Sequence, residues 1–318
     1  MLGKWAEEKL VILAVAILLF YPQALNAEPI YQEGIFEDNS GSAKKEEVSA
    51  KKPQPADEQE DELPGSLDTH IKFMPSSGVK SQSGRVEMIE QTSDFSYDFK
   101  VADKLPVTFL FNQSYIKINK TVSVPLPAYL TGVGMGLETT LPFFFNNTYL
   151  RIGAIPSFYS DGWHFRPSVF RMTGRLFLIY KPDKKWIYVL GAGVWPSHNV
   201  RPLPIVGFIY RPSERWTFNI TPDNPNIAYM MSDKATVFVE GFGSEDEYEV
   251  TRNNEKNVVL KYREMHAGTG LRYKFNKFIQ CTFSVGGMFN RSFKYKDDQD
   301  KVSIKDGLYT DFRIEINM

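Results

Sequence analysis

The side chains that could carry out hydrolysis are two loop histidines and the serines beside them. They are His164 with Ser157, Ser160 and Asp161, and His198 with Ser197. A serine nucleophile needs a histidine base at hydrogen-bond distance, and the base needs a third group to orient it. Neither loop has a motif that fixes this geometry, so we interpret both histidines as solvated. The sequence predicts no enzyme, and hydrolysis is the weakest of the functional hypotheses.

Metal and cofactor chemistry is predicted to be absent as well. His70 and His266 stand far apart in the sequence, without the spacing of a metal site. The glycines of Gly132–Gly136 do not stand between a strand and a helix, as a phosphate-binding loop would require, and we interpret them as small residues on a strand. The single cysteine, Cys281, excludes an intramolecular disulfide.

Charged residues at alternate positions are the remaining candidates for a function. In the last segment, Leu308, Phe312 and Ile316 share one face, whereas charged residues occupy the opposite face. A period of two residues is typical of a β-strand with two different faces. The same alternation occurs before Tyr180 and before Phe275. Taken together, these strands give the candidate inward-facing side chains Arg171, Arg175, Arg272, Lys274, Asp311, Arg313 and Glu315.

The turns between the strands favour a membrane barrel over a soluble sheet. Residues 180–186 and 210–216 each begin with Tyr, end with Trp and enclose a polar turn, and weaker copies begin at Tyr229 and Tyr273. Aromatic residues flanking short turns are typical of the girdle of an outer-membrane β-barrel. The candidate interface aromatics are Tyr180, Trp186, Tyr210, Trp216, Tyr229 and Tyr273.

Long connections between the tight turns indicate a barrel inserted from the periplasm. We expect long loops at residues 160–168, 196–204, 243–257 and 294–307. About 13 strand segments can be counted from residue 84 to the end, whereas bacterial barrels have an even number of strands. Either Ile227–Met231 is not a strand or Thr69–Met74 supplies another. We predict an all-β, antiparallel transmembrane β-barrel of about 12 strands, with 14 as the neighbouring possibility.

The N-terminal quarter of the chain differs in character from the rest. Residues 10–20 form an apolar run that is too short to span a bilayer, followed by Ala27 at a plausible cleavage site. The next segment is rich in acids and poor in apolar residues, which predicts disorder. The expected organisation is a signal peptide at 1–27, a mostly disordered periplasmic segment at 28–83 and an outer-membrane barrel at 84–318.

Net charge argues against a nucleic-acid partner. The chain has 37 basic and 38 acidic side chains and no basic arm. The expected partners are outer-membrane lipid and the barrel-assembly machinery, and the oligomeric state stays open. The expected location is the bacterial outer membrane, reached by signal-peptide-directed export.

Three segments carry a resemblance to a known family: residues 181–186, 201–207 and 211–218. Together they resemble an uncharacterised bacterial outer-membrane β-barrel family, a domain of unknown function numbered 6268, over about residues 105–318. The resemblance implies the same fold and location and brings no activity or catalytic residues. The chain departs from the usual outer-membrane C-terminus because it ends on Met318 rather than on an aromatic residue.

Two functional hypotheses from different classes follow. Inward charges of both signs can line a water-filled channel for small solutes, or they can pair and fill the lumen of a structural or partner-binding barrel. The interior of a barrel of about 12 strands lies between a filled small barrel and an open porin, so barrel size does not decide between them.

Overall fold

The computed structural model describes residues 64–80, 82–102, 104–163, 166–194, 202–222, 225–252, 255–296 and 300–318. The expected signal peptide and the two loop histidines, His164 and His198, lie outside the described residues. Within the described part of the chain, no helix is long and apolar enough to cross a membrane. Its one helical element is the 3-10 turn η2 (Pro167–Val169).

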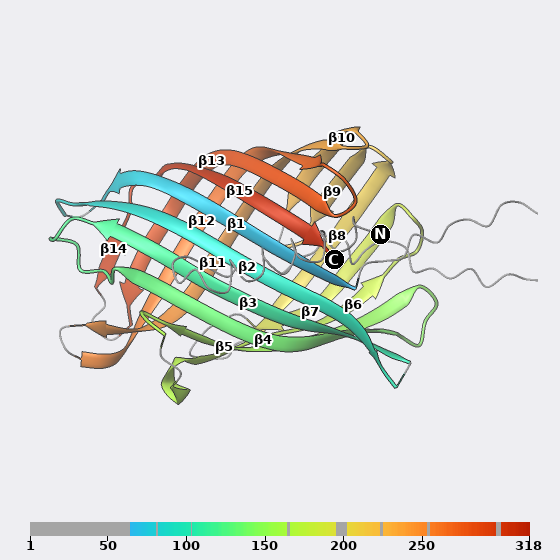
Figure 1. Ribbon diagram of the computed structural model, residues 1–318, viewed down its shortest axis with the longest axis horizontal. Coiled ribbons are helices and arrows are strands. Elements are labelled where there is room, and N and C mark those ends of the chain that lie inside the picture. Colours follow the sequence, from blue (N-terminus) through green and yellow to red (C-terminus); the bar gives the residue numbers. More distant parts are fainter. Residues whose placement is uncertain are drawn as a thin grey trace, which may run out of the picture.

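Fifteen strands make up almost all of the described chain (Figure 1). They are β1 (Gly65–Gly78), β2 (Arg85–Val101), β3 (Leu105–Lys120), β4 (Tyr129–Pro142), β5 (Thr148–Ser160), β6 (Phe170–Tyr180), β7 (Trp186–Val194), β8 (Leu203–Ser213), β9 (Trp216–Ile220), β10 (Asn226–Ser232), β11 (Ala235–Arg252), β12 (Glu255–Lys274), β13 (Ile279–Tyr295), β14 (Lys301–Ser303) and β15 (Gly307–Asn317).

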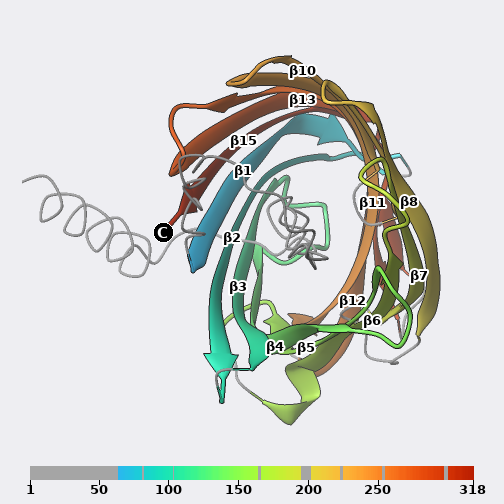
Figure 2. The same ribbon diagram turned by 90° about the vertical axis from the view of Figure 1, so that its right-hand side faces the viewer.

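The strands close into an antiparallel barrel, which confirms the predicted fold class. Each strand from β1 to β13 pairs with its neighbour in sequence, and β15 completes the ring by pairing with β13 and β1. Figure 2 shows this ring from the end where the C-terminus lies. The short β14 pairs with the loop-end part of β13, and β15 pairs with the rest of the same strand. β14 and β15 therefore occupy one position in the wall, which has 14 strands. The predicted count of about 12 was wrong, and the neighbouring value of 14 is observed.

Two segments explain the error in the count. β10 shows that Ile227–Met231 is a strand, and β1 contains Thr69–Met74. The barrel therefore begins at Gly65, inside the range 28–83 that was assigned to a mostly disordered segment, and not at residue 84. β1 resembles a solvated segment in sequence because its inward positions include Asp68 and Lys72, whose partners lie on other strands.

The two ends of the barrel differ. At one end, which we call the turn end, tight turns such as residues 214–215 and 233–234 join the strands, and both Gly65 and Asn317 lie there. At the other end, the loop end, connections such as residues 121–128 and 161–169 are longer. Short turns face the periplasm in outer-membrane barrels, and we therefore expect the loop end to face outward.

The outer face of the wall is apolar over the membrane-spanning part. Large apolar side chains alternate with inward residues along the strands and are exposed, including Ile71, Phe73, Leu137, Leu176, Leu190, Val206, Phe283, Leu308 and Phe312. A barrel needs such a band because hydrocarbon offers no hydrogen bonds to polar groups.

The strands of the wall differ in length, so the number of strands around the barrel changes along its axis. β9 and β10 have five and seven residues, whereas β11, β12 and β13 have 18, 20 and 17. About 9–11 residues suffice to span a membrane, so these three strands project beyond it. The segment 243–257, expected as a long loop, is mainly the projecting hairpin of β11 and β12. Its outward residues are charged, as in Lys261 beside Glu245, which explains the error.

Where β6–β10 have ended, β5 meets β11 directly. Ser160 pairs in parallel with Glu249 across this junction. The Asp161 amide donates to the Glu249 carbonyl at 3.0 Å, and the Thr251 amide donates to Asp161 Oδ2 at 2.7 Å. The five strands β1–β5, the three strands β11–β13 and the line of β14 and β15 remain, nine in all. The barrel is therefore wide at the turn end and narrow at the loop end.

An apolar core fills the narrow part. Inward side chains of all its strands pack together, with Met74, Met88, Ile116, Leu130, Leu260 and Phe293 almost completely buried. Val124 and Leu126 enter this core from the loop that joins β3 to β4, and Pro125 between them accepts a hydrogen bond of 2.6 Å from the Tyr295 hydroxyl. Barrels of about eight strands have interiors that side chains can fill, and the nine-stranded part is close to that size.

Replacing Phe293 by Ala is expected to lower the free energy of unfolding by about 3–5 kcal/mol, because it leaves a cavity in the loop-end core. Urea unfolding of the folded protein in lipid vesicles measures this change. Leu308→Ala, on the exposed outer face, is the matched control and should cost less. Equal costs for the two variants would contradict the assignment of Phe293 to a packed core.

Candidate functional site in the barrel interior

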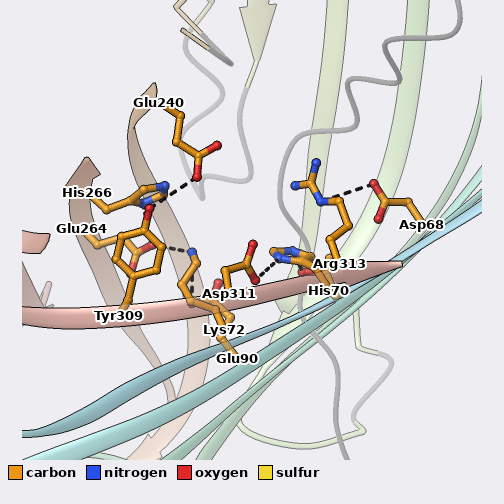
Figure 3. A network of polar contacts seen from close by, with 11 residues as sticks. Asp68, His70, Lys72, Glu90, Glu240, Glu264, His266, Tyr309, Asp311 and Arg313 are labelled. Atoms are coloured by element: carbon orange, nitrogen blue, oxygen red, sulfur yellow. Dashed lines mark hydrogen bonds and ion pairs between the residues drawn. The ribbon is translucent and has the colours of Figure 1, made fainter. Parts of the chain in front are cut away.

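A cluster of polar and charged side chains lies inside the barrel, and Figure 3 shows its contacts. It adjoins the apolar core, to which Tyr309 also belongs. It draws on the inward positions of β1, β2, β11, β12 and β15, because successive inward residues on a strand stand two apart. Its members are Asp68, His70, Lys72, Glu90, Glu240, Glu264, His266, Tyr309, Asp311 and Arg313. We call this cluster the lumen network.

Lys72 is at the centre of the network and is almost fully buried. Its Nζ donates to Glu264 Oε1 at 3.1 Å and lies 3.7 Å from Glu90 Oε2. Glu264 also accepts a hydrogen bond from the Tyr262 hydroxyl, and its Oε1 lies 3.8 Å from Nδ1 of His266. One cation thus stands between two carboxylates, which offsets part of the cost of removing these charges from water.

A second part of the network lies nearer the turn end. His70 Nδ1 lies 3.1 Å from Asp311 Oδ1, and its Nε2 contacts the Thr92 hydroxyl. Arg313 Nε lies 3.6 Å from Asp68 Oδ2. These contacts link β15, β1 and β2, which are neighbours in the wall. The inner face here is polar and contains both signs of charge.

Glycines make room for the side chain that crosses the network. The Tyr309 hydroxyl donates to Glu240 Oε1 at 3.4 Å, and thereby reaches from β15 over β13 and β12 to β11. A Cβ at Gly268 would come within 2.3 Å of the Tyr309 hydroxyl oxygen, and one at Gly286 within 2.2 Å of a backbone carbonyl. Neither position accepts a larger residue without displacement of the wall or of Tyr309.

Another ion cluster lies on the opposite wall. Arg151 Nε is 3.1 Å from Glu138 Oε1, and Arg175 Nε donates to the other oxygen of Glu138. Gly153 lies between them, where a Cβ would come within 2.9 Å of Glu138 Oε2. The inner face of β6–β8 next to this cluster is apolar and is formed by Phe177, Ile179, Ile187, Val189, Ile205 and Ile209.

The seven candidate inward residues occupy different surroundings. Arg175, Asp311 and Arg313 belong to the two ion clusters. Glu315 accepts a 2.9 Å hydrogen bond from the Gln280 amide group, and the Arg272 guanidinium lies 5.5 Å from the Phe238 ring centroid. Lys274 is exposed at the turn end, away from the clusters.

Arg171 lies at the junction of β5 and β11, not in either ion cluster. Its Nε donates to the Glu247 carbonyl at 3.3 Å, and its Nη1 donates to the carbonyls of Ser168 and Phe170. Beside it, the Ser168 hydroxyl donates to Glu249 Oε1 at 3.1 Å. Through these hydrogen bonds, Arg171 links β6 and η2 to β11 at the level where the barrel narrows.

The six candidate aromatics lie at the turn end. Five of them form one row across β6–β10. The ring centroids of Trp186 and Tyr210 lie 4.1 Å apart, and those of Trp216 and Tyr229 lie 4.8 Å apart. Tyr188 stacks on Tyr180 and so extends the row to β6. The sixth, Tyr273, contacts Phe275 at the end of β12.

Sequence reasoning missed most of the lumen network. Asp68, His70 and Lys72 were lost because β1 was assigned to a disordered segment. Glu264 and His266 were missed because the alternation on their strand was followed only at its C-terminal end, around Arg272 and Lys274. Extending the alternation of Arg272 backward along β12 would have placed both on the inner face.

The fold and the polar interior define a closed, antiparallel outer-membrane-type barrel. The chain belongs to the family described as a domain of unknown function, DUF6268, whose family model matches residues 111–312. No curated protein matches the sequence.

Solved outer-membrane channels have similar folds. The COG4313 outer membrane channel from Pseudomonas putida F1 has a TM-score of 0.45 and 9% identity, covering 83% of this chain and 99% of that one. The TodX monoaromatic hydrocarbon channel has a TM-score of 0.43 and 10% identity, covering 80% and 90%. The NanC porin has a TM-score of 0.39 and 8% identity, covering 79% and 100%. Similarity at this level gives no solute for the present chain.

Replacing Lys72 by Met is expected to cost about 3–5 kcal/mol of folding free energy, because it leaves two carboxylates buried without their cation. In the double variant Lys72→Met/Glu264→Gln, the total loss of unfolding free energy should be smaller than the sum of the losses in the two single variants. Urea unfolding of all three variants in vesicles gives the coupling energy. Strict additivity would contradict a direct interaction between Lys72 and Glu264.

Proposed function

We propose that the protein is an outer-membrane channel for small polar solutes and that the conformation described above is its closed state. One observation carries the proposal: along the axis, the inner face changes from the wide end, where ion clusters lie beside the apolar residues of β6–β8, to a buried apolar core that fills the narrow end. A wall of 14 strands encloses more space than side chains of an eight-stranded barrel fill. Solutes entering from the turn end would therefore meet the lumen network first.

The apolar core is the gate of this proposed channel. An apolar constriction blocks ions and polar solutes because water leaves it. Val124 and Leu126 are the natural moving part, since they belong to the loop between β3 and β4 rather than to the wall. The inward charges on both sides of the lumen would supply alternate partners for charged groups of a solute.

The surroundings of the barrel follow from the same proposal. We infer that signal-peptide-directed export delivers the chain to the periplasm and that the barrel-assembly machinery inserts it. The aromatic row on β6–β10 would then lie at the periplasmic membrane interface, in contact with outer-membrane lipid. The apolar outer band supports this placement.

A partner-binding barrel with a filled lumen is the second candidate. The observation that favours it is the tight packing of the loop-end core, where Met88, Leu260 and Phe293 have no exposed surface. Opening such a core would expose apolar area at about 25 cal/mol per Å². A function that never opens the core would avoid this cost.

Single-channel recording in planar bilayers distinguishes the two candidates. The native protein is expected to be silent most of the time, and Val124→Ser/Leu126→Ser should produce frequent stepwise openings because it wets the constriction. Phe144→Ser/Phe145→Ser, which changes two exposed aromatics at the turn end, is the matched control and should leave the traces unchanged. Silence of folded, inserted native protein and of both variants would favour the closed partner-binding barrel.

A further inference from the structure

The turn end has a set of basic side chains without acidic partners. They occupy the turns and strand ends of five hairpins and are Lys100, Lys104, Lys185, Arg211, Arg215, Lys234, Lys274 and Lys277. Across the described residues, none of the eight forms an ion pair with an acidic side chain. All except the half-buried Arg211 are exposed. We call these eight residues the basic ring.

At the loop end, several basic side chains have acidic partners. There, Lys261 Nζ lies 2.7 Å from Glu245, Arg252 Nη2 lies 2.6 Å from Asp300, and Lys80 is paired as well. Other basic side chains of the loop end, including Lys256, Arg263 and Lys301, form no ion pair with a described acidic residue. Basic side chains without an ion pair thus occur at both ends, and the turn end is the one at which Gly65 enters the barrel.

Two of the acids at the turn end, Asp98 and Asp183, are occupied by local hydrogen bonds, whereas Glu214 and Asp233 are exposed beside Arg215 and Lys234. Asp183 accepts from the amides of Lys185 and Trp186 at 2.7 and 2.9 Å, and Asp98 accepts from the Thr108 hydroxyl at 2.5 Å. They shape the turns in which they lie. Like charges gathered at one mouth repel one another, so an anionic partner would be bound favourably there.

The chain contains such an anion close to this mouth. Residues 57–62 read Asp-Glu-Gln-Glu-Asp-Glu, and Gly65 of β1 follows shortly after. The point of entry is fixed, because the Asp98 amide donates to the Pro64 carbonyl at 2.5 Å, directly beside the turn between β2 and β3.

Geometry allows the acidic run to reach both neighbouring basic turns. A chain extends at most about 3.5 Å per residue, so Asp57 can lie up to roughly 28 Å from Gly65. Lys100 and Lys104 belong to the adjacent hairpin. Lys274 and Lys277 flank the turn between β12 and β13, which stands about three strand spacings, or roughly 14 Å, from β1.

We propose that the basic ring is a docking surface for the acidic run 57–62 of the same chain, centred on Lys100, Lys104, Lys274 and Lys277. The tether raises the local concentration of the run to the millimolar range, which favours it over a separate acidic protein. Phosphates of the inner-leaflet lipids are the competing occupant. The proposal does not depend on whether the barrel conducts.

Carbodiimide cross-linking of the full chain, folded in a neutral detergent, tests the proposal. Amide links between carboxylates of the acidic run and the amines of Lys104 or Lys277 are identified by mass spectrometry. The yield at low salt should exceed that at high salt by about tenfold, because several exposed ion pairs act together. Links from the more distant Glu46 and Glu47 serve as the internal reference and should be weaker.

Two matched variants separate docking from simple proximity. Lys100→Gln/Lys104→Gln should reduce the links to Lys277 several-fold, since it removes half of the central charge while leaving the reacting amine in place. Lys80→Gln/Lys305→Gln removes the same charge at the loop end and should leave the yield unchanged. Links that are insensitive to salt and to both variants would overturn the proposal.

Repeating the measurement in lipid nanodiscs tests the competing occupant. The links should persist in discs of phosphatidylcholine and in discs that also contain phosphatidylglycerol. Their loss only in the anionic discs would show that lipid phosphates occupy the basic ring in a membrane and would overturn the assignment to residues 57–62.

Discussion

The direct contact between β5 and β11 is the constraint on which the rest of the structure depends. Because β6–β10 end early, the nine remaining strands have to close on themselves, and the Ser160–Glu249 pair marks the closure. Without it, the long strands would leave an exposed edge with unpaired backbone groups, which could pair with another chain. Asp161, Ser168 and Arg171 add the hydrogen bonds that hold this junction.

Narrowing of the wall decides what can fill the interior at each level. In the nine-stranded part, opposite walls are close enough for apolar side chains to meet, and they form a dry core. The 14-stranded part is wider, and its inner face combines the two ion clusters with the apolar residues of β6–β8. The lumen network lies beside the boundary, where Lys72 and Glu264 are buried by the core and still paired with each other.

Much of the fold could be predicted from the sequence, because alternation on β15, β6 and the C-terminal part of β12 is regular and the Tyr and Trp residues mark the tight turns. The prediction failed where the environment of a strand departs from the simple pattern. β1 has charged inward residues that find partners only in the closed barrel. The projecting halves of β11 and β12 have charged outward residues because they stand in water.

The candidate site was predictable only on strands that had been recognised. Asp311 and Arg313 were found on β15, whereas their partners His70 and Asp68 lie on β1. Ion pairs between strands that are distant in sequence depend on the order of the wall and on its closure, which alternation within one strand does not reveal. Arg171 shows the same limit, since its contacts with β11 exist only because the wall narrows.

Disulfide formation across the junction tests the central claim most directly. Ser160→Cys and Glu249→Cys, combined with Cys281→Ser to remove the native thiol, place two thiols on the paired positions of β5 and β11. A disulfide requires Cα atoms about 4.4–6.8 Å apart, which is the range of paired strands. The account predicts rapid formation of this disulfide in the folded, membrane-inserted protein. Thiols that stay free under oxidising conditions would contradict the narrowing of the barrel.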